Sequence, residues 1–134
     1  MSGIVYILRG IPGSGKSTLA RKLALGNNCE IHSTDSYFVK DGKYCFDASK
    51  LGEYHNRNLE AFQRSLDERI EIVIVDNTNS RKWEFAKYEQ AAEDANYSVC
   101  VVSLQHPSPE EAFSRNTHNV PIEAIRNMIA RWEF

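Results

Sequence analysis

A nine-residue segment near the start of the chain has the residue types and spacing that hold a phosphate group. Its sequence, GIPGSGKST from Gly10 to Thr18, matches the pattern G-x-x-x-x-G-K-[ST]. Glycine lets the backbone approach an anion closely, and the N–H groups of the loop and of the following helix point at it. Lysine in this pattern reaches the β- and γ-phosphates, and the next serine ligates Mg²⁺. We therefore predict that this segment binds a nucleotide through Gly13, Ser14, Gly15, Lys16, Ser17 and Thr18. Lys16 is also predicted to be catalytic.

An acidic residue, Asp76, ends an apolar run that predicts a buried strand. A carboxylate in this place, beside a phosphate loop, can hold Mg²⁺ directly or through water. The alternative is a turn cap, because the segment DNTN that begins at Asp76 is rich in turn-forming residues. We favour the metal role, shared with Ser17, because a phosphate loop needs a metal partner.

A second acidic residue, Asp35, follows the predicted strand at 30–33 in the segment STDS. Phosphoryl transfer to an alcohol benefits from a carboxylate that accepts the hydroxyl proton. After this strand, Asp35 could point across a cleft at the γ-phosphate and serve as that base. It could equally cap a turn, and the residue pattern does not separate the two roles.

A single arginine, Arg115, ends a predicted helix and precedes the loop 116–120. A mobile loop that carries an arginine could close over a nucleotide and neutralise the charge that develops during transfer. The alternative is a solvated surface arginine, and the spacing leaves both open. His55 lies on the apolar stripe of its predicted helix, which favours a hydrogen-bonded core histidine over a catalytic one, and Asn58 could point to the same cleft.

Aromatic residues fall into two groups along the chain. Helical spacing predicts that Trp83, Tyr88 and Trp132 belong to the core. Three others lie close to Asp35 in sequence and could stack on a nucleobase, namely Tyr37, Phe38 and Tyr44.

Predicted strands alternate with predicted helices. Apolar, β-branched runs predict strands at 4–8, 30–33, 70–76 and 98–104, and helical signals predict helices at 18–25, 49–68, 83–96, 108–115 and from 121 onward. Asp41-Gly42 predicts a hairpin within 37–46. The order implies an α/β fold in three layers, with a parallel sheet of about four strands. Ligands of such sheets bind beyond the carboxyl ends of the strands, where the glycine loop and both acids fall.

The composition fits one globular domain, predicted to span residues 1–134. Hydrophobic residues make up 42% and charged residues 25%, and the net charge of −2 argues against nucleic-acid binding through a broadly basic surface. A few local cations could still hold a nucleic-acid end. The chain shows no apolar stretch of membrane-spanning length and no signal-peptide pattern, so we expect a cytoplasmic or otherwise intracellular protein. The cysteines are expected to be reduced core residues; they are Cys29, Cys45 and Cys100.

Four segments together resemble the polynucleotide 5′-hydroxyl kinase branch of the P-loop kinases. They are LRGIPGSGKSTLAR, STDSYF with DGKYCFD, IVIVDNTN with WEFAKY, and RNTHNVPIEAIRNM. The likeness covers about residues 4–132 and is closer still to the kinase-like domain of the Nedd4-binding-protein-2 group. The first segment is common to many kinases, whereas the other three are much more specific.

This resemblance implies a P-loop kinase-like fold and an ATP- and Mg²⁺-dependent kinase activity that phosphorylates the 5′-OH end of RNA or DNA. It implies that Asp35 is the general base, that Asp76 lies near the metal, and that Arg115 belongs to a lid over the ATP phosphates. The chain departs from the branch in two places. Phe38 stands where the phage kinase has an arginine that contacts the acceptor phosphate, and the shorter lid offers only His118 or Asn119 near the place of a second arginine.

Two other functions stay open from the sequence. One is a small-molecule or metabolite kinase on the same fold, which the modest negative charge and Phe38 favour. The other is a non-enzymatic nucleotide-binding module of a larger protein, against which the intact Lys16, Ser17, Asp35 and Asp76 argue. Neither RNA versus DNA preference nor oligomeric state is predicted.

Overall fold

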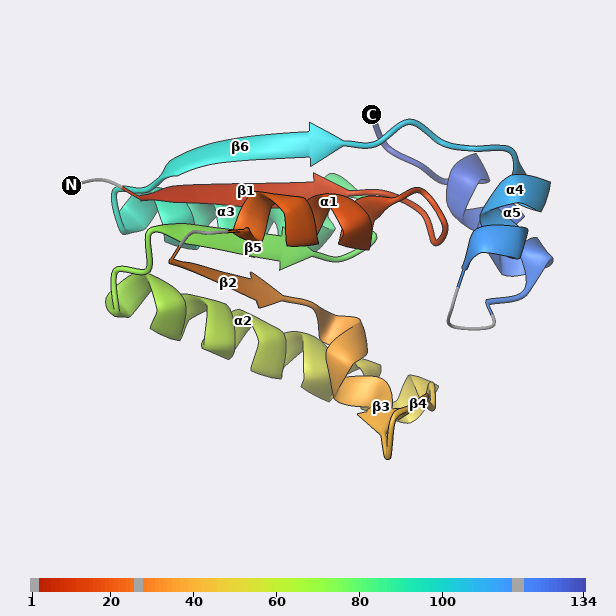
Figure 1. Cartoon of the computed structure of the whole chain (residues 1–134), viewed down its shortest axis with the longest axis horizontal. Helices are drawn as coiled ribbons and strands as arrows, with labels where there is room; N and C mark the ends of the chain where they lie inside the picture. Colours follow the sequence, from red (N-terminus) through yellow and green to blue (C-terminus); the bar gives the residue numbers. More distant parts are fainter. Residues whose placement is uncertain (1–2, 26–27, 117–119) are drawn as a thin grey trace.

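A four-stranded parallel sheet forms the centre of the molecule (Figure 1). The computed structural model describes residues 3–25, 28–116 and 120–134. The sheet has the order β2-β5-β1-β6. Its strands are β1 (Ile4–Arg9), β2 (Cys29–His32), β5 (Ile72–Asp76) and β6 (Ser98–Ser103). The predicted strand number and parallel arrangement are therefore confirmed.

The two central strands, β1 and β5, are apolar because helices cover both of their faces. Val5, Ile7, Val73 and Val75 are fully buried. The register pairs Leu8 of β1 with Asp76 of β5. The carboxyl ends of these strands therefore meet at one edge of the sheet, and the residues that follow each strand gather there.

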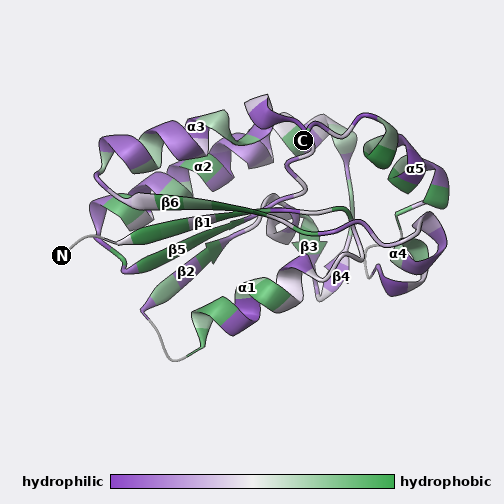
Figure 2. Ribbon diagram, turned by 90° about the horizontal axis from the view of Figure 1, so that it is seen from above, coloured by the Kyte–Doolittle hydropathy of each residue, from purple (hydrophilic) through white to green (hydrophobic). Residues whose placement is uncertain are grey.

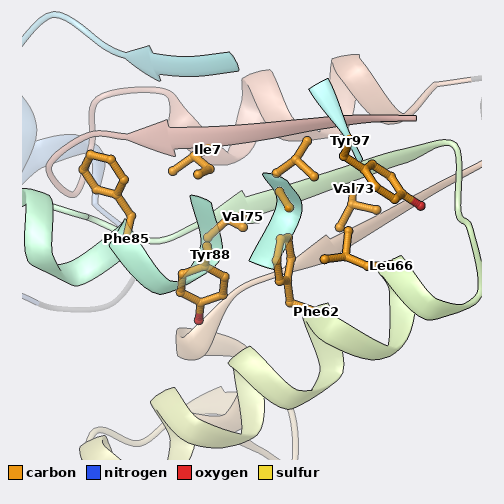
Figure 3. Packing of buried hydrophobic residues seen from close by; sticks show 10 residues of the cluster. Ile7, Phe62, Leu66, Val73, Val75, Phe85, Tyr88 and Tyr97 are labelled. Atoms are coloured by element: carbon orange, nitrogen blue, oxygen red, sulfur yellow. The ribbon is translucent and has the colours of Figure 1, made fainter. Parts of the chain in front are cut away.

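Helices form one layer on each side of the sheet (Figure 2). Helix α1 (Lys16–Ala24) covers one face, and α2 (Leu51–Asp67) and α3 (Lys82–Asp94) cover the other. The larger core cluster lies between the sheet and the second layer, where Phe62 packs against Tyr88 with ring centroids 5.0 Å apart (Figure 3). This arrangement confirms the predicted three-layer α/β fold.

The predicted hairpin is present and is shorter than the sequence suggested. Strands β3 (Val39–Lys40) and β4 (Lys43–Tyr44) pair antiparallel around Asp41 and Gly42, whose φ angles of 52° and 78° suit a two-residue turn. Residues 34–38 instead form a 3₁₀ helix, η1 (Thr34–Phe38), and a second one, η2 (Ala48–Lys50), leads into α2.

Phe38 is 1% exposed inside an aromatic cluster under this hairpin. Its ring centroid lies 4.7 Å from that of Tyr54 and 5.1 Å from that of Phe46. The prediction that Phe38 could stack on a nucleobase is therefore wrong, because its ring packs between the hairpin and α2.

Two short helices, α4 (Pro109–Arg115) and α5 (Ile122–Ala130), lie beyond the carboxyl ends of the strands (Figure 1). The predicted cap is confirmed, because the Ser108 hydroxyl accepts a hydrogen bond from the N–H of Glu111 at 3.2 Å. Both helices pack against the glycine loop: Ile11 is buried with Ala112 and Ile125. A Cβ on Gly13 would lie 2.3 Å from the Ala112 carbonyl oxygen, so this close approach requires glycine.

Several side chains predicted to lie in the core do not lie there. Trp83 is 76% exposed, because it lies on the face of α3 opposite to the buried residues Phe85, Tyr88 and Ala92. Tyr88 and Trp132 are buried as predicted. Cys45 and Cys100 are exposed, since one lies beside the hairpin and the other on the edge strand β6. Among the described residues no helix combines the length and apolar character needed to cross a membrane.

A buried histidine links the edge strand β2 to α2. His32 Nε2 lies 2.7 Å from Ser65 Oγ, and Ser65 donates its only hydroxyl hydrogen to Glu30 at 2.9 Å. Ser65 must therefore accept from a protonated Nε2, which the neutral ring supplies. Burial lowers the pKa of His32 below its ordinary value of 6.5, nearby Arg64 lowers it further, and Glu30 opposes both.

We predict that the free energy of unfolding falls as the pH drops below about 6.5, where the unfolded histidine takes up a proton and the folded one does not. Urea denaturation at pH 7.5 and 5.5 measures this change. His32→Gln should lose less stability on acidification than the wild type. An equal loss in both proteins would contradict the assignment.

Candidate active site

The loop that connects β1 to α1 has the backbone shape of a phosphate cradle. Gly13 and Gly15 have φ angles of 81° and 94°, in the left-handed region that glycine adopts without strain. A Cβ added to Gly15 would meet no atom within 4 Å, so the space beside it is open. The first N–H groups of α1 have no acceptor within the helix and face this space.

Ser14 adds a polar group to the loop. Its hydroxyl is buried and has no hydrogen-bond partner among the residues that the structure describes. This hydroxyl lies beside Gly10, since a Cβ on Gly10 would be 2.4 Å from it, and Ser14 does not line the cleft. The open space beside Gly15 and the left-handed glycines, not this hydroxyl, therefore fit a phosphate group.

Lys16 and Ser17 converge on Asp76 at the end of β5. Lys16 Nζ lies 2.7 Å from Asp76 Oδ1, and the side chains of Lys16 and Asp76 are only 13% and 7% exposed. Ser17 Oγ donates to Asp76 Oδ2 at 3.2 Å. Asp76 therefore faces the loop rather than capping the turn that follows it, which is the geometry that its predicted metal role requires.

A hydroxyl and a carboxylate are the hard oxygen ligands that Mg²⁺ prefers. Ser17 and Asp76 would hold the ion there, and the described residues contain no cluster of three or more metal-ligating side chains elsewhere. Kinase sites commonly bind Mg²⁺ through one or two protein groups, with water and phosphate oxygens completing the shell. The residues present therefore fit Mg²⁺, which neutralises the charge of the phosphates when it is bound.

Asp35 lies across the sheet edge, in the first turn of η1. Tyr44 of the hairpin donates its hydroxyl to Asp35 Oδ1 at 3.4 Å. Burial, and secondarily the charge of Asp35 and this hydrogen bond, raise the pKa of Tyr44 well above its ordinary value, so the phenol keeps its proton. A pocket of about 250 Å³ is lined by Asp35 together with Ser17 and Asp76. The structure thus brings the predicted base and the predicted metal ligands to one pocket.

A polar network that the sequence did not single out holds Asp35 in place. The N–H of Thr34, next to Asp35, donates to Asn77 Oδ1 at 2.9 Å, and Thr34 Oγ1 lies 3.0 Å from His55 Nδ1. Asn77 directly follows Asp76, so this bond ties the end of β2 to the end of β5. The turn-forming character of the segment was the available signal, but the cross-strand bond is visible only in the fold.

Helix α2 divides its apolar stripe between the core and the site. His55 is hydrogen-bonded as predicted but exposed, and it lines a cleft rather than the core. Asn58 was expected to face the cleft, yet it is 1% exposed and donates to the Tyr88 hydroxyl at 3.0 Å. Asn58 lies four residues from both Tyr54 and Phe62 and therefore falls on the buried stripe of α2.

One large cleft joins most of the predicted parts, although Asp76 lines only the smaller pocket. It has a volume of about 1170 Å³, and its lining includes the glycine loop, Lys16, Ser17, Asp35 and Arg115. Arg115 is exposed and pairs with Glu111 at 3.0 Å, one turn earlier in α4. In this structure Arg115 is a surface arginine, as the alternative interpretation expected, and its side chain borders the cleft. His118 and Asn119 lie outside the described residues.

A family model described as an AAA domain matches residues 5–133. The chain belongs to this family. It is 36% identical to human NEDD4-binding protein 2 over 137 residues, which confirms the predicted likeness to that group. The match covers 97% of this chain and only 8% of the relative, so the chain corresponds to a small part of that protein.

Solved structures confirm the P-loop kinase-like fold. A chain of the Pnkp1/Rnl/Hen1 RNA repair complex superposes with a TM-score of 0.76 at 19% identity, over 97% of this chain and 44% of the other. Kti12 from Chaetomium thermophilum in complex with ADP-AlF3 superposes with a TM-score of 0.70 at 18% identity, over 97% and 80% of the two chains. At these identities the likeness concerns the fold alone.

We predict that Lys16→Met destabilises the protein by roughly 3 kcal/mol, because it leaves the Asp76 carboxylate buried without its partner. The double variant Lys16→Met with Asp76→Asn should recover most of this loss, since it removes both charges. Urea denaturation of the four proteins in the cycle measures the coupling. Equal stability of Lys16→Met and the wild type would contradict a close ion pair.

Proposed function

We propose that this chain is an ATP- and Mg²⁺-dependent kinase that phosphorylates the 5′-OH end of RNA or DNA. The observation that carries the proposal is the single cleft that joins the phosphate cradle to a carboxylate 3.4 Å from a tyrosine hydroxyl, with Arg115 at its border. A donor site alone would bind a nucleotide. A carboxylate across the same pocket gives an acceptor hydroxyl a place to lose its proton.

In the proposed reaction Asp35 accepts the proton of the acceptor hydroxyl as its oxygen bonds to the γ-phosphorus of ATP. The bond from that phosphorus to the bridging oxygen breaks, and ADP leaves. Lys16 and the loop N–H groups hold the phosphates in line for this displacement. Arg115 leaves its solvent-exposed partner Glu111 and contacts the transferred group instead. Breaking the pair with Glu111 costs little free energy, because an exposed ion pair contributes little stability.

Charges near the cleft support a nucleic-acid end as the acceptor. The chain as a whole has a net charge of −2, yet the cleft lining includes four cations besides Lys16, namely Arg21, Lys87, Arg115 and Arg131. Local cations can hold the phosphates of a strand end without binding long duplexes. Buried Phe38 cannot contact an acceptor phosphate, so any such contact must come from these other residues.

We predict that Asp35→Asn lowers kcat for a 5′-OH oligonucleotide by about 100-fold or more, because it removes the general base. The affinity for ATP should stay within about twofold, since Asp35 does not belong to the phosphate cradle. Transfer of labelled phosphate to RNA and DNA oligonucleotides, compared with a panel of small alcohols, measures the effect. Asp41→Asn, in the exposed hairpin turn, is the matched control.

Transfer to a small alcohol and to no oligonucleotide would reject the nucleic-acid acceptor while keeping the kinase. Full activity of Asp35→Asn would reject the base. ATP binding without transfer to any acceptor would reject the enzyme and leave a nucleotide-binding module.

We further predict that Arg115→Ala lowers kcat by at least about tenfold with little change in stability, because the side chain acts on charge that develops during transfer. Arg126→Ala is the matched control, since Arg126 pairs with Glu110 and Glu123 on the surface and does not line the cleft. Steady-state kinetics of both variants test the role. Equal kcat values would make Arg115 a surface arginine.

A further inference from the structure

Among the described residues that line the cleft, the most exposed large hydrophobic side chain is a tryptophan. Trp83 lies in the first turn of α3 and is 76% exposed, while the other tryptophan, Trp132, is 8% exposed. Trp83 also belongs to the cleft lining that contains Asp35. A flat, polarisable indole that no core residue covers is a ready surface for another π-system.

A second exposed aromatic ring comes from a different element and lines the same cleft. Phe46 follows β4 and is 56% exposed. One side of its ring is held by Phe38, with centroids 5.1 Å apart, and Phe38 is itself buried against Tyr54. The packing of Phe38 therefore anchors Phe46 and leaves the rest of its ring toward solvent. Little conformational entropy remains to be lost when a ligand stacks on an anchored ring.

A cation accompanies Trp83 on the same helix. Lys87 is four residues after Trp83, so the two side chains lie on one face of α3, and Lys87 also lines the cleft. Within the described part of the chain, the side chain of Lys87 makes no hydrogen bond or ion pair. Its ammonium group is thus available for a phosphate that lies beside a stacked base.

We propose that Trp83 and Phe46 form a stacking surface for the bases at the 5′ end of a single-stranded acceptor. Lys87 contacts the phosphate that links the stacked nucleotides. The inference rests on the proposed function and names the part of the acceptor that the cleft recognises. Every base has a π-face, so such a surface tolerates any sequence. With one lysine contact, binding depends more weakly on salt than it does for proteins that neutralise many phosphates.

Fluorescence tests stacking without turnover. A 5′-OH oligonucleotide added without ATP should quench the emission of exposed Trp83, whereas buried Trp132 contributes a constant background. Trp83→Phe should abolish the quenching and keep the binding. The control is Phe113→Ala, because Phe113 is 47% exposed and does not line the cleft. Quenching that persists in Trp83→Phe would overturn the proposal.

Kinetics test what stacking contributes. Trp83→Ala should raise the KM for a 5′-OH oligonucleotide by about tenfold or more, with kcat and the KM for ATP nearly unchanged. Trp83→Phe, which keeps an aromatic ring, should have a KM close to that of the wild type. In the wild type, an oligonucleotide whose 5′-terminal residues lack bases should show the same rise in KM, and Trp83→Ala should add nothing to it. A KM for Trp83→Ala within twofold of the wild type would overturn the proposal.

The two proposals fail in different ways. Quenching that depends on Trp83, in a protein that transfers phosphate to no acceptor, supports the stacking surface and rejects the kinase. Transfer to oligonucleotides with no quenching and no effect of Trp83→Ala rejects the stacking surface and supports the kinase. Lys87→Ala should raise KM and flatten the salt dependence of binding; an unchanged salt dependence would overturn the phosphate contact.

Discussion

A buried arginine at the end of β1 fixes the geometry around which the site is built. Arg9 is 4% exposed, and its guanidinium lies between the rings of Phe85 and Trp132, 5.0 Å and 5.1 Å from their centroids. Its N–H groups donate to backbone carbonyls of three residues distant in sequence, Asn79, Ser80 and Glu133. Burial lowers the pKa of Arg9, and the nearby Glu133 and Glu84 oppose that change. A charge in this place requires all of these partners. The glycine loop, the start of α3 and the end of the chain are therefore held together.

The proposed donor and acceptor sides of the cleft differ physically. On the donor side the Lys16–Asp76 pair compensates buried charge within the protein, so the cradle keeps its shape before a nucleotide arrives. On the acceptor side the rings of Trp83 and Phe46 are left exposed instead of being buried. Asp35 stands between the two sides, held through Thr34 and Asn77 to the same strand end that carries Asp76. Parallel strand ends explain why these residues meet, because the sheet register aligns them.

Local patterns predicted most of the elements, and the errors concern which side chains are buried. The glycine loop, the four strands and the Asp41-Gly42 turn follow from short-range preferences that the tertiary structure leaves unchanged. The errors at Trp83 and Asn58 concern which face of a helix is buried: Asn58 falls on the buried stripe of α2 with Tyr54 and Phe62, and Trp83 falls opposite the buried stripe of α3. The error at Cys45 and Cys100 arose because the hairpin and the edge strand leave these positions exposed.

The sequence by itself determined the phosphate cradle and the order of strands and helices, because glycine conformations, apolar runs and turn residues act over a few positions. It also supplied Asp35, Asp76 and Arg115 as candidates, without deciding between chemical and capping roles. Only the tertiary structure decided that Asp76 faces Lys16 and Ser17, that Phe38 is buried, and that Trp83 lies open beside the cleft. The reason is that these outcomes depend on contacts between residues far apart in the chain. The sheet register and the packing of the helices on the sheet bring those residues together.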